Sequence, residues 1–181
     1  MKKLRNAVLM TAACCLSLLA INCNRQKAPK TVDLPFTAEA LGEYKYAGPD
    51  TLPDQKCTGS LSAFRVIVDA AGTGTPMGRF TAHFDFCGDT LSHYGNGYAF
   101  LADEKGDTLF FDVSGQVLDG RLEEHPESVI SYWKDSFKII GGTGQYKGST
   151  GTIMSDDYNS SEDQYSHHNW KGTLTLIKGN K

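Results

Sequence analysis

The sequence predicts an all-β domain, an antiparallel barrel of about eight strands, with a β-sandwich as the alternative. Apolar and polar residues alternate in several stretches, as at Phe80, Ala82, Phe84 and Phe86. This two-residue period is typical of strands that bury one face. Glycine-containing turns separate these stretches, and no helical period is found outside the N-terminal segment. A closed barrel of this size has an interior that holds side chains or one small ligand.

The expected strands follow one another with short connections. They cover residues 34–47, 58–69, 78–87, 94–102, 107–115, 129–140, 147–156 and 168–178. Gly106 provides the left-handed position of a hairpin turn at residues 104–106. Residues 118–127 are expected to form a loop or a short helix that ends at Pro126. Residues 156–163 are acidic but lack the ligand spacing and central glycine of a calcium loop, so we expect a solvated loop there.

Residues 137–151 predict a strand, a glycine turn and a second strand. Five glycines are assigned a structural role, because glycine supplies positive φ angles at turns and space where strands crowd. They are Gly141, Gly142, Gly144, Gly148 and Gly151. A dinucleotide-binding loop would need a helix immediately afterwards. The residues that follow are rich in glycine and β-branched side chains, so we expect no nucleotide cofactor.

Residues 139–151 resemble the signature GGTG-x-[YF]-x-G-[AS]-x-G of bacterial secreted proteins and lipoproteins related to allene oxide cyclase and dirigent-like β-barrels. Residues 72–81 and 103–110 are similar to two further segments of such proteins. The resemblance spans most of residues 59–177 and implies the barrel fold, but the family has no single activity. The catalytic polar residues of the plant cyclase match no position here, so no catalytic residue is assigned.

Residues 1–22 are expected to be a signal peptide, because basic residues precede an uncharged apolar run that is short for a transmembrane span. Residues 19–23 resemble a bacterial lipobox, in which the cysteine, here Cys23, is lipidated after cleavage. Asn22 departs from the small residue usual at that place, and the alternative is a plain signal peptide cut nearby. Residues 23–33 would then be the lipidated cysteine and a flexible tether, and residues 34–181 a single domain.

These features predict an exported protein of the bacterial cell envelope, held at the periplasm or outer membrane by a lipid anchor. The formal net charge is −3, and it becomes −6 without residues 1–22, which contain three basic and no acidic residues. Phosphate binding requires clustered lysine and arginine, so we expect no nucleic-acid partner. Self-association into homo-oligomers stays open.

Two cysteines follow Cys23, and an even pair in an exported protein predicts a disulfide between Cys57 and Cys87. A hairpin centred near Gly72 would place Phe64 opposite Phe80 and bring the two cysteines together at its open end. The alternative is two separate buried thiols.

Aromatic residues in the predicted strands are the candidates for a ligand pocket. They are Tyr98, Phe100, Phe111, Trp133 and Trp170. Core packing is the usual role of such residues, but those at one mouth of a small barrel can line an apolar pocket. We find no motif for a nucleophilic serine, and His167 and His168 would point to opposite faces of a strand. No catalytic residue, cofactor or metal ligand is therefore assigned.

The function that the sequence favours is non-catalytic binding of a small apolar ligand inside the barrel. One alternative is a cyclase or isomerase, which would need a buried polar or ionisable group facing the cavity with a shifted pKa. Another alternative is an envelope protein-interaction module, which a filled barrel with an exposed apolar patch would favour.

Overall fold

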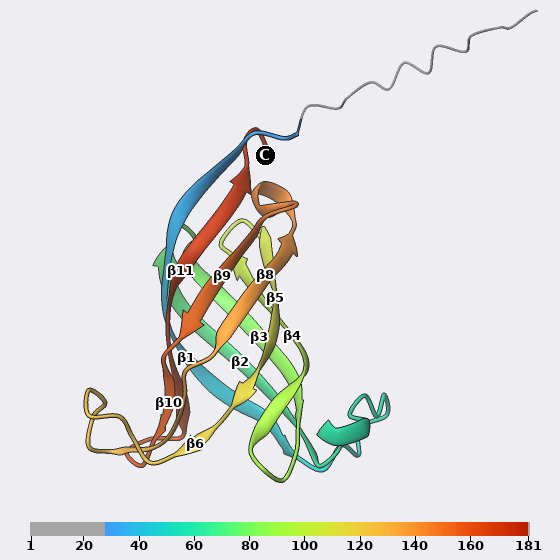
Figure 1. The fold of residues 1–181 in the computed structure, drawn as a ribbon, viewed down its shortest axis with the longest axis vertical. Coiled ribbons are helices and arrows are strands. Elements are labelled where there is room, and N and C mark those ends of the chain that lie inside the picture. Colours follow the sequence, from blue (N-terminus) through green and yellow to red (C-terminus); the bar gives the residue numbers. More distant parts are fainter. Residues whose placement is uncertain (1–27, 181) are drawn as a thin grey trace, which may run out of the picture.

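The structure is a computed structural model that describes residues 28–180, and its regular elements are strands and two short 3₁₀ turns (Figure 1). The strands are β1 Thr31–Gly48, β2 Phe64–Thr75, β3 Gly78–Gly88, β4 His93–Asp103, β5 Thr108–Gln116, β6 Leu118–Asp119, β7 Val129–Trp133, β8 Ser136–Gly142, β9 Thr150–Ser155, β10 Asp157–Ser160 and β11 Tyr165–Ile177. The 3₁₀ turns are η1 Gly59–Leu61 and η2 Gly144–Tyr146. Within residues 28–180, no helix is long and apolar enough to cross a membrane. The predicted signal peptide and Cys23 lie outside the described residues.

Eight of the strands close into an antiparallel barrel. They follow the order β1-β2-β3-β4-β5-β8-β9-β11, and β11 pairs with β1 to complete the circle. The predicted barrel is therefore confirmed, and the sandwich alternative is wrong. Closure satisfies the strand edges that an open sheet would expose. The remaining strands extend from β11 in the order β10-β7-β6 and form a small side sheet near one end of the barrel (Figure 1).

The barrel is filled by large side chains at the end where the described chain starts and finishes. Phe36, Phe111 and Leu174 are each at most 1% exposed there, and Phe36 packs edge-on against Phe111 at 6.4 Å. Farther along, small residues of β1 face large inward residues of β11: Ala38 pairs with Trp170, and Ala40 pairs with His168. This alternation of small and large side chains keeps the interior packed while leaving room near the other end.

The glycine stretch forms the β8–β9 connection at the filled end. Gly141, Gly144, Gly148 and Gly151 have positive φ angles. Gly142 lies so close to β5 that a Cβ atom would overlap the carbonyl oxygen of Thr108.

The register predicted for the hairpin of β2 and β3 was wrong. Phe64 pairs with Gly88 rather than with Phe80, and the strands continue past Gly72 to a turn that Gly78 completes with a φ of 75°. Gly72 lies within β2, where a Cβ atom would overlap the carbonyl oxygen of Glu39. Its role is therefore close approach of β1 rather than chain reversal.

Two other sequence expectations need correction at the side sheet. The predicted strand 129–140 is two strands, because β7 pairs with β10 outside the barrel while β8 pairs with β5 and β9. The predicted acidic loop 156–163 contains β10, whose first residue, Asp157, is 1% exposed. Polar residues fill the inward positions of this strand, so the apolar alternation that marks the other strands is missing here.

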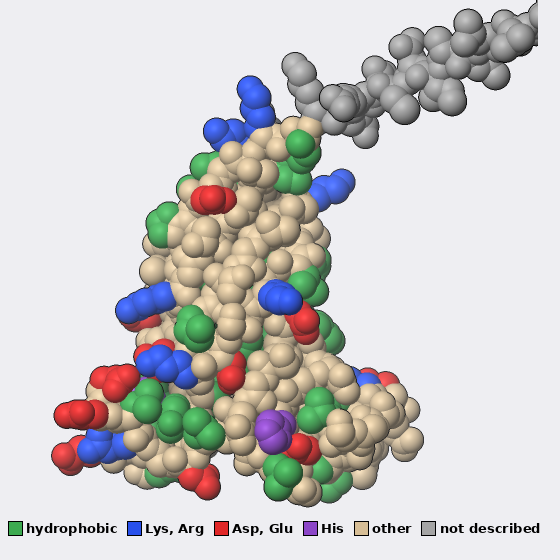
Figure 2. Space-filling view, in the orientation of Figure 1, with side chains coloured by type: hydrophobic (Ala, Val, Ile, Leu, Met, Phe, Trp, Pro, Cys, Tyr) green, Lys and Arg blue, Asp and Glu red, His purple; other side chains and the backbone are tan. Residues whose placement is uncertain are grey.

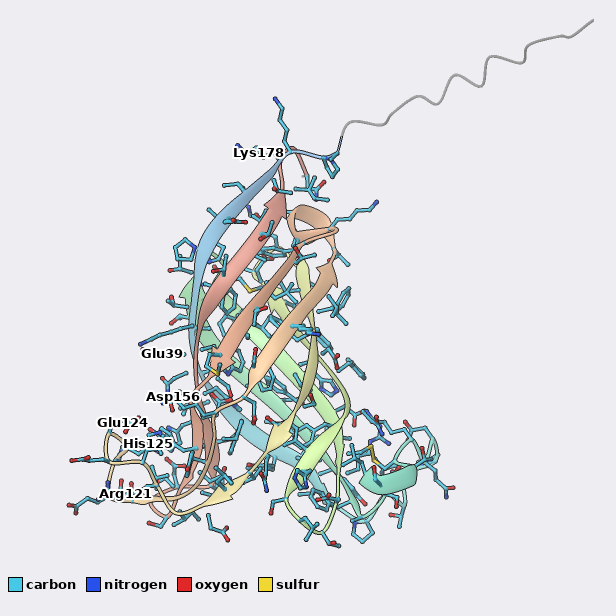
Figure 3. All side chains as sticks on the ribbon, viewed as in Figure 1. Glu39, Arg121, Glu124, His125, Asp156 and Lys178 are labelled. Carbon is cyan, nitrogen blue, oxygen red and sulfur yellow. A yellow bond between two sulfur atoms is a disulfide. The ribbon has the colours of Figure 1, made fainter. Side chains whose placement is uncertain are left out.

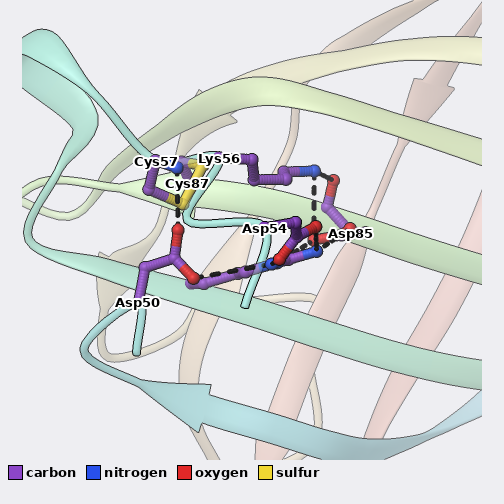
Figure 4. Close-up of a disulfide and its surroundings, with 7 residues drawn as sticks. Asp50, Asp54, Lys56, Cys57, Asp85 and Cys87 are labelled. Carbon is purple, nitrogen blue, oxygen red and sulfur yellow. Dashed lines mark hydrogen bonds and ion pairs between the residues drawn. A yellow bond between two sulfur atoms is a disulfide. The ribbon is translucent and has the colours of Figure 1, made fainter. Parts of the chain in front are cut away.

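Cys57 and Cys87 form the predicted disulfide, with their Cα atoms 5.4 Å apart (Figure 4). Cys57 lies in the loop before β2 rather than opposite Cys87 in a hairpin, because Cys87 pairs with Arg65. The bond therefore fastens the loop of residues 49–63 to β3. Arg65 supports the same loop: its guanidinium donates to both carboxylate oxygens of Asp85 at 2.7–2.8 Å and also to Asp54.

The segment between β6 and β7 is a loop without a helix, and it projects beside β10 (Figure 3). His125 of this loop contacts the Asp156 carboxylate through Nε2 at 3.1 Å, and Lys134 contacts Glu124 at 3.3 Å. Figure 2 shows that lysine and arginine side chains on this face of the molecule are dispersed, with acidic side chains beside many of them.

Candidate functional site

A cavity of about 250 Å³ occupies the barrel end opposite the filled one. Its wall is mainly apolar and aromatic, and polar side chains from β10 and β11 lie on one side. The lining residues used below are Tyr44, Ser92, Tyr94, Val113, Trp133, Asp157, Asn159, Ser166 and His168. Tyr44 and Ser92 are exposed, so the cavity reaches the surface beside them. An apolar cavity of about 150 Å³ can hold benzene, so this space can hold a somewhat larger organic molecule.

The Asp157 carboxylate is the centre of the polar side. Its Oδ2 accepts hydrogen bonds from the indole Nε1–H groups of Trp133 and Trp170, both at 3.0 Å. His168 Nδ1 contacts the same oxygen at 2.9 Å, and Oδ1 accepts the backbone N–H of Asn169 at 2.9 Å. An indole N–H and a backbone N–H can only donate, so this environment suits an ionised carboxylate.

These contacts determine the proton positions on a neutral His168. Because the Asp157 carboxylate accepts, Nδ1 carries the proton, and Nε2 is left with a lone pair. Ser166 Oγ lies 2.9 Å from Nε2 and donates its proton there. The imidazole stacks on Phe84 with ring centres 5.4 Å apart and planes inclined by 16°. Asp157, His168 and Ser166 therefore form a continuous hydrogen-bonded chain that ends beside the cavity.

Gly42 on β1 makes room for the end of this chain. It pairs with Ser166 across the strands, and a Cβ atom at position 42 would overlap Ser166 Oγ and crowd His168 Nε2. Ser166 and His168 are two residues apart on β11, so both point into the barrel. His167 lies between them and faces outward, as the sequence predicted, where its ring stacks on Tyr158 at 4.6 Å.

A second polar group lies in the cavity wall at Tyr94. Its hydroxyl donates to Asp135 Oδ2 at 2.8 Å. Burial, together with the charge and hydrogen bonding of Asp135, raises the pKa of Tyr94, so the phenol stays protonated. Burial also raises the pKa of Asp135, although the hydrogen bond from Tyr94 opposes this. Tyr94 is therefore a buried polar group that faces the cavity and has a shifted pKa. The cyclase or isomerase alternative requires such a group.

The predicted pocket aromatics are dispersed over the barrel. Trp133 lines the cavity, and Trp170 lies behind it as a donor to Asp157. Phe111 belongs to the packed core. Tyr98 and Phe100 do not line the cavity, because the neighbours Ala99 and Leu101 occupy the inward positions of β4. Tyr98 and Phe100 instead contact His83, with ring centres 6.1 and 5.5 Å away.

Sequence reasoning missed the polar chain. The acidic composition of residues 156–163 predicts a solvated loop around Asp157, and no pattern marks Ser166, because polar residues at inward positions lack the apolar alternation of a buried strand face. The available signal was the alternation of Ser166, His168 and Trp170 on one face of the last strand. Among residues 28–180, no group of three His, Cys, Asp or Glu side chains is arranged to hold a metal ion.

Comparison with known proteins finds similarity in structure but not in sequence. No family model matches the chain, and no curated protein matches it. The solved structure of the pterocarpan synthase dirigent protein GePTS1 is similar with a TM-score of 0.47 and 12% identity, over 83% of this chain and 90% of that chain. The pterocarpan synthase dirigent protein PsPTS1 gives a TM-score of 0.49 and 11% identity, over 83% and 97% of the two chains. The expected glycine signature and its bacterial lipoprotein relatives stay predictions.

Proposed function

We propose that this protein binds one small, neutral, mainly apolar molecule in the barrel cavity. The observation that carries the proposal is an aromatic-lined cavity of about 250 Å³ with hydrogen-bonding side chains on one side. Such a composition is typical of small-molecule sites, in which apolar walls supply affinity and a few polar groups set orientation. The ligand's ring or chain would lie against Val113 and Trp133, and its polar group would face Ser166 and His168.

The charges around the cavity favour a neutral ligand over an anion. None of the lining residues in the described chain is a lysine or an arginine. The Asp157 carboxylate lies in the wall, and its hydrogen bonds come from indole, imidazole and backbone N–H groups. An anionic ligand would lose its hydration and meet a negative charge of the same sign.

The proposal includes export and lipid anchoring at Cys23. Its support is the basic and apolar N-terminal pattern and the Cys57–Cys87 disulfide, because disulfides persist in oxidising compartments. Membrane attachment would then come from the lipid, and the barrel cavity would face the envelope space.

Calorimetric titration tests the binding proposal with 2-naphthol as the neutral probe and 2-naphthalenesulfonate as the anionic one. For a ligand of this size we expect a Kd for 2-naphthol of roughly 10 μM to 1 mM, with at least about tenfold weaker binding of the sulfonate. Val113→Phe should abolish 2-naphthol binding by filling the cavity. Ile140→Phe is the matched control, because Ile140 is 59% exposed on the outside of the barrel. Equal binding to both variants would contradict the proposed site.

A further inference from the structure

We propose that Ser166 is a nucleophile, with His168 as its general base and Asp157 as the positioning residue, and that the cavity accepts small neutral esters for acyl transfer to water. This inference rests on the proposed function, because the ester would occupy the same cavity. It assigns the ligand class and adds a reaction that binding alone does not require.

The geometry contains the two hydrogen bonds that such a nucleophile needs. Ser166 Oγ lies 2.9 Å from His168 Nε2, and His168 Nδ1 lies 2.9 Å from Asp157 Oδ2. Activated serines on unrelated folds share this order of serine, imidazole and carboxylate, which is recognised by geometry rather than by sequence motif. The usual motif is absent here because Ser166 and His168 come from one strand and Asp157 from its neighbour in the side sheet.

The surroundings of the imidazole hold it in one orientation. Its ring stacks on Phe84, and its centre lies 5.4 Å from that of Trp170. The Asp157 carboxylate is in turn fixed by two indole N–H groups at 3.0 Å. Nδ1 and Nε2 of His168 are therefore held against Asp157 and Ser166 before any substrate enters. Such preorganisation is what a general base requires to take a proton at a defined atom.

A purely structural role accounts less well for the buried carboxylate. Taking an ion out of water is costly, and replacing buried ionic groups with apolar residues is often neutral or stabilising. At the filled end the core is mainly apolar, as at Phe36 and Leu174, and the buried Asp103 carboxylate there accepts a hydrogen bond from Tyr146. At the cavity end, Gly42 instead leaves the space that Ser166 Oγ and His168 Nε2 occupy. Asp157, His168 and Ser166 thus form one hydrogen-bonded chain beside the space that is open to a ligand.

The Tyr44 hydroxyl supplies a donor for the charge that develops on the ester carbonyl oxygen. It donates to Asn159 Oδ1 at 2.8 Å and lines the cavity together with Ser166. Burial raises the pKa of Tyr44, so the hydroxyl keeps its proton. In the reaction it would turn from Asn159 to the carbonyl oxygen, where a donor stabilises the tetrahedral intermediate.

The reaction is balanced with water as the second reactant. Ser166 Oγ forms a bond to the carbonyl carbon while its proton moves to His168 Nε2. The bond from the carbonyl carbon to the alcohol oxygen breaks, and the alcohol leaves with the proton from Nε2. Water then attacks the acyl-serine, gives a proton to Nε2 and releases the acid, and Ser166 Oγ recovers its proton. No oxidation or reduction takes place.

The test is covalent labelling of the purified protein with phenylmethanesulfonyl fluoride, which places a benzylsulfonyl group on an activated serine oxygen and releases fluoride. Peptide mass spectrometry should locate one adduct on Ser166. Ser166→Ala should abolish it, and His168→Gln should slow labelling by at least about 100-fold. Ser114→Ala is the matched control, because Ser114 is an exposed serine of β5 that does not line the cavity, and its labelling should equal that of the wild type.

Hydrolysis of 4-nitrophenyl acetate gives a second readout, and Ser166→Ala should remove the part of the rate that 2-naphthol inhibits. An adduct on Ser166 that 2-naphthol prevents would support the nucleophile. No adduct, or equal labelling of Ser166→Ala, together with intact 2-naphthol binding would overturn the nucleophile and leave the proposed function standing. If the wild-type protein is not labelled at Ser166 and does not bind 2-naphthol, both the nucleophile and the proposed binding function are overturned.

Discussion

Asp157→Asn is the substitution that most sharply tests the polar chain, because it keeps the side-chain volume and changes one oxygen to an NH₂ group. If the NH₂ replaces Oδ1, it faces the Asn169 N–H, so that this N–H loses its acceptor and the new NH₂ has none. If it replaces Oδ2, the indole N–H groups of Trp133 and Trp170 and the Nδ1–H group of His168 lose their acceptor. Each buried donor left without an acceptor costs about 1–3 kcal/mol. Even the less costly orientation leaves two donors without an acceptor and should therefore lower the free energy of unfolding by about 2–6 kcal/mol.

Urea denaturation followed by tryptophan fluorescence measures this loss, since the protein's two tryptophans both contact Asp157. Asp156→Asn is the control, because the Asp156 carboxylate is 39% exposed and contacts both His125 Nε2 and the exposed Lys134 ammonium group. We expect that variant to lose less than about 1 kcal/mol. A loss below about 0.5 kcal/mol for Asp157→Asn would refute the description of Asp157 as an ionised acceptor for four donors.

Three further outcomes are expected. Replacing Cys57 and Cys87 together by serine opens a loop with a sequence separation of 30 residues and should cost about 3–4 kcal/mol; reductant should lower the wild-type stability to that of the variant without affecting the variant. Burial alone would raise the pKa of Asp85, but hydrogen bonds led by that from Arg65 outweigh it and lower the pKa. The resulting stability is present above about pH 4 and is lost as the pH falls through the folded-state pKa, so Arg65→Met should weaken the fall in unfolding free energy below about pH 4. In a bacterial host, Cys23→Ala should move the protein from the detergent phase to the aqueous phase of a Triton X-114 partition, and an unchanged distribution would contradict lipid anchoring.

The alternation of apolar residues predicted the fold class because it records which residues face inward. It could not determine the register of β2 and β3. Phe64 pairs with Gly88 instead of Phe80, a displacement of eight residues. An even displacement leaves the same residues facing inward, so the pattern is equally consistent with either register. The close approach of Gly72 to β1 is consistent only with the observed register of β2 and β3. This contact joins distant parts of the chain, so the local sequence pattern does not reveal it.

The candidate site was less predictable for a related reason. In β4, residues 98–101 are apolar at every position, so alternation gave no reason to place Tyr98 and Phe100 outside. In β10 and β11 the inward positions include Asp157, Ser166 and His168, which the usual rule assigns to solvent. Their burial depends on the side sheet, which brings β7 and β10 against the start of β11.

A crystal structure of the protein with 2-naphthol tests the central claim most directly, because it locates the ligand and its polar group together. We predict that the ring system lies in the cavity against Val113 and Trp133, with the naphthol oxygen within about 3.2 Å of Ser166 Oγ or His168 Nε2. A ring bound only on the outer surface, or a cavity that the protein's own side chains fill at saturating 2-naphthol, would contradict the account.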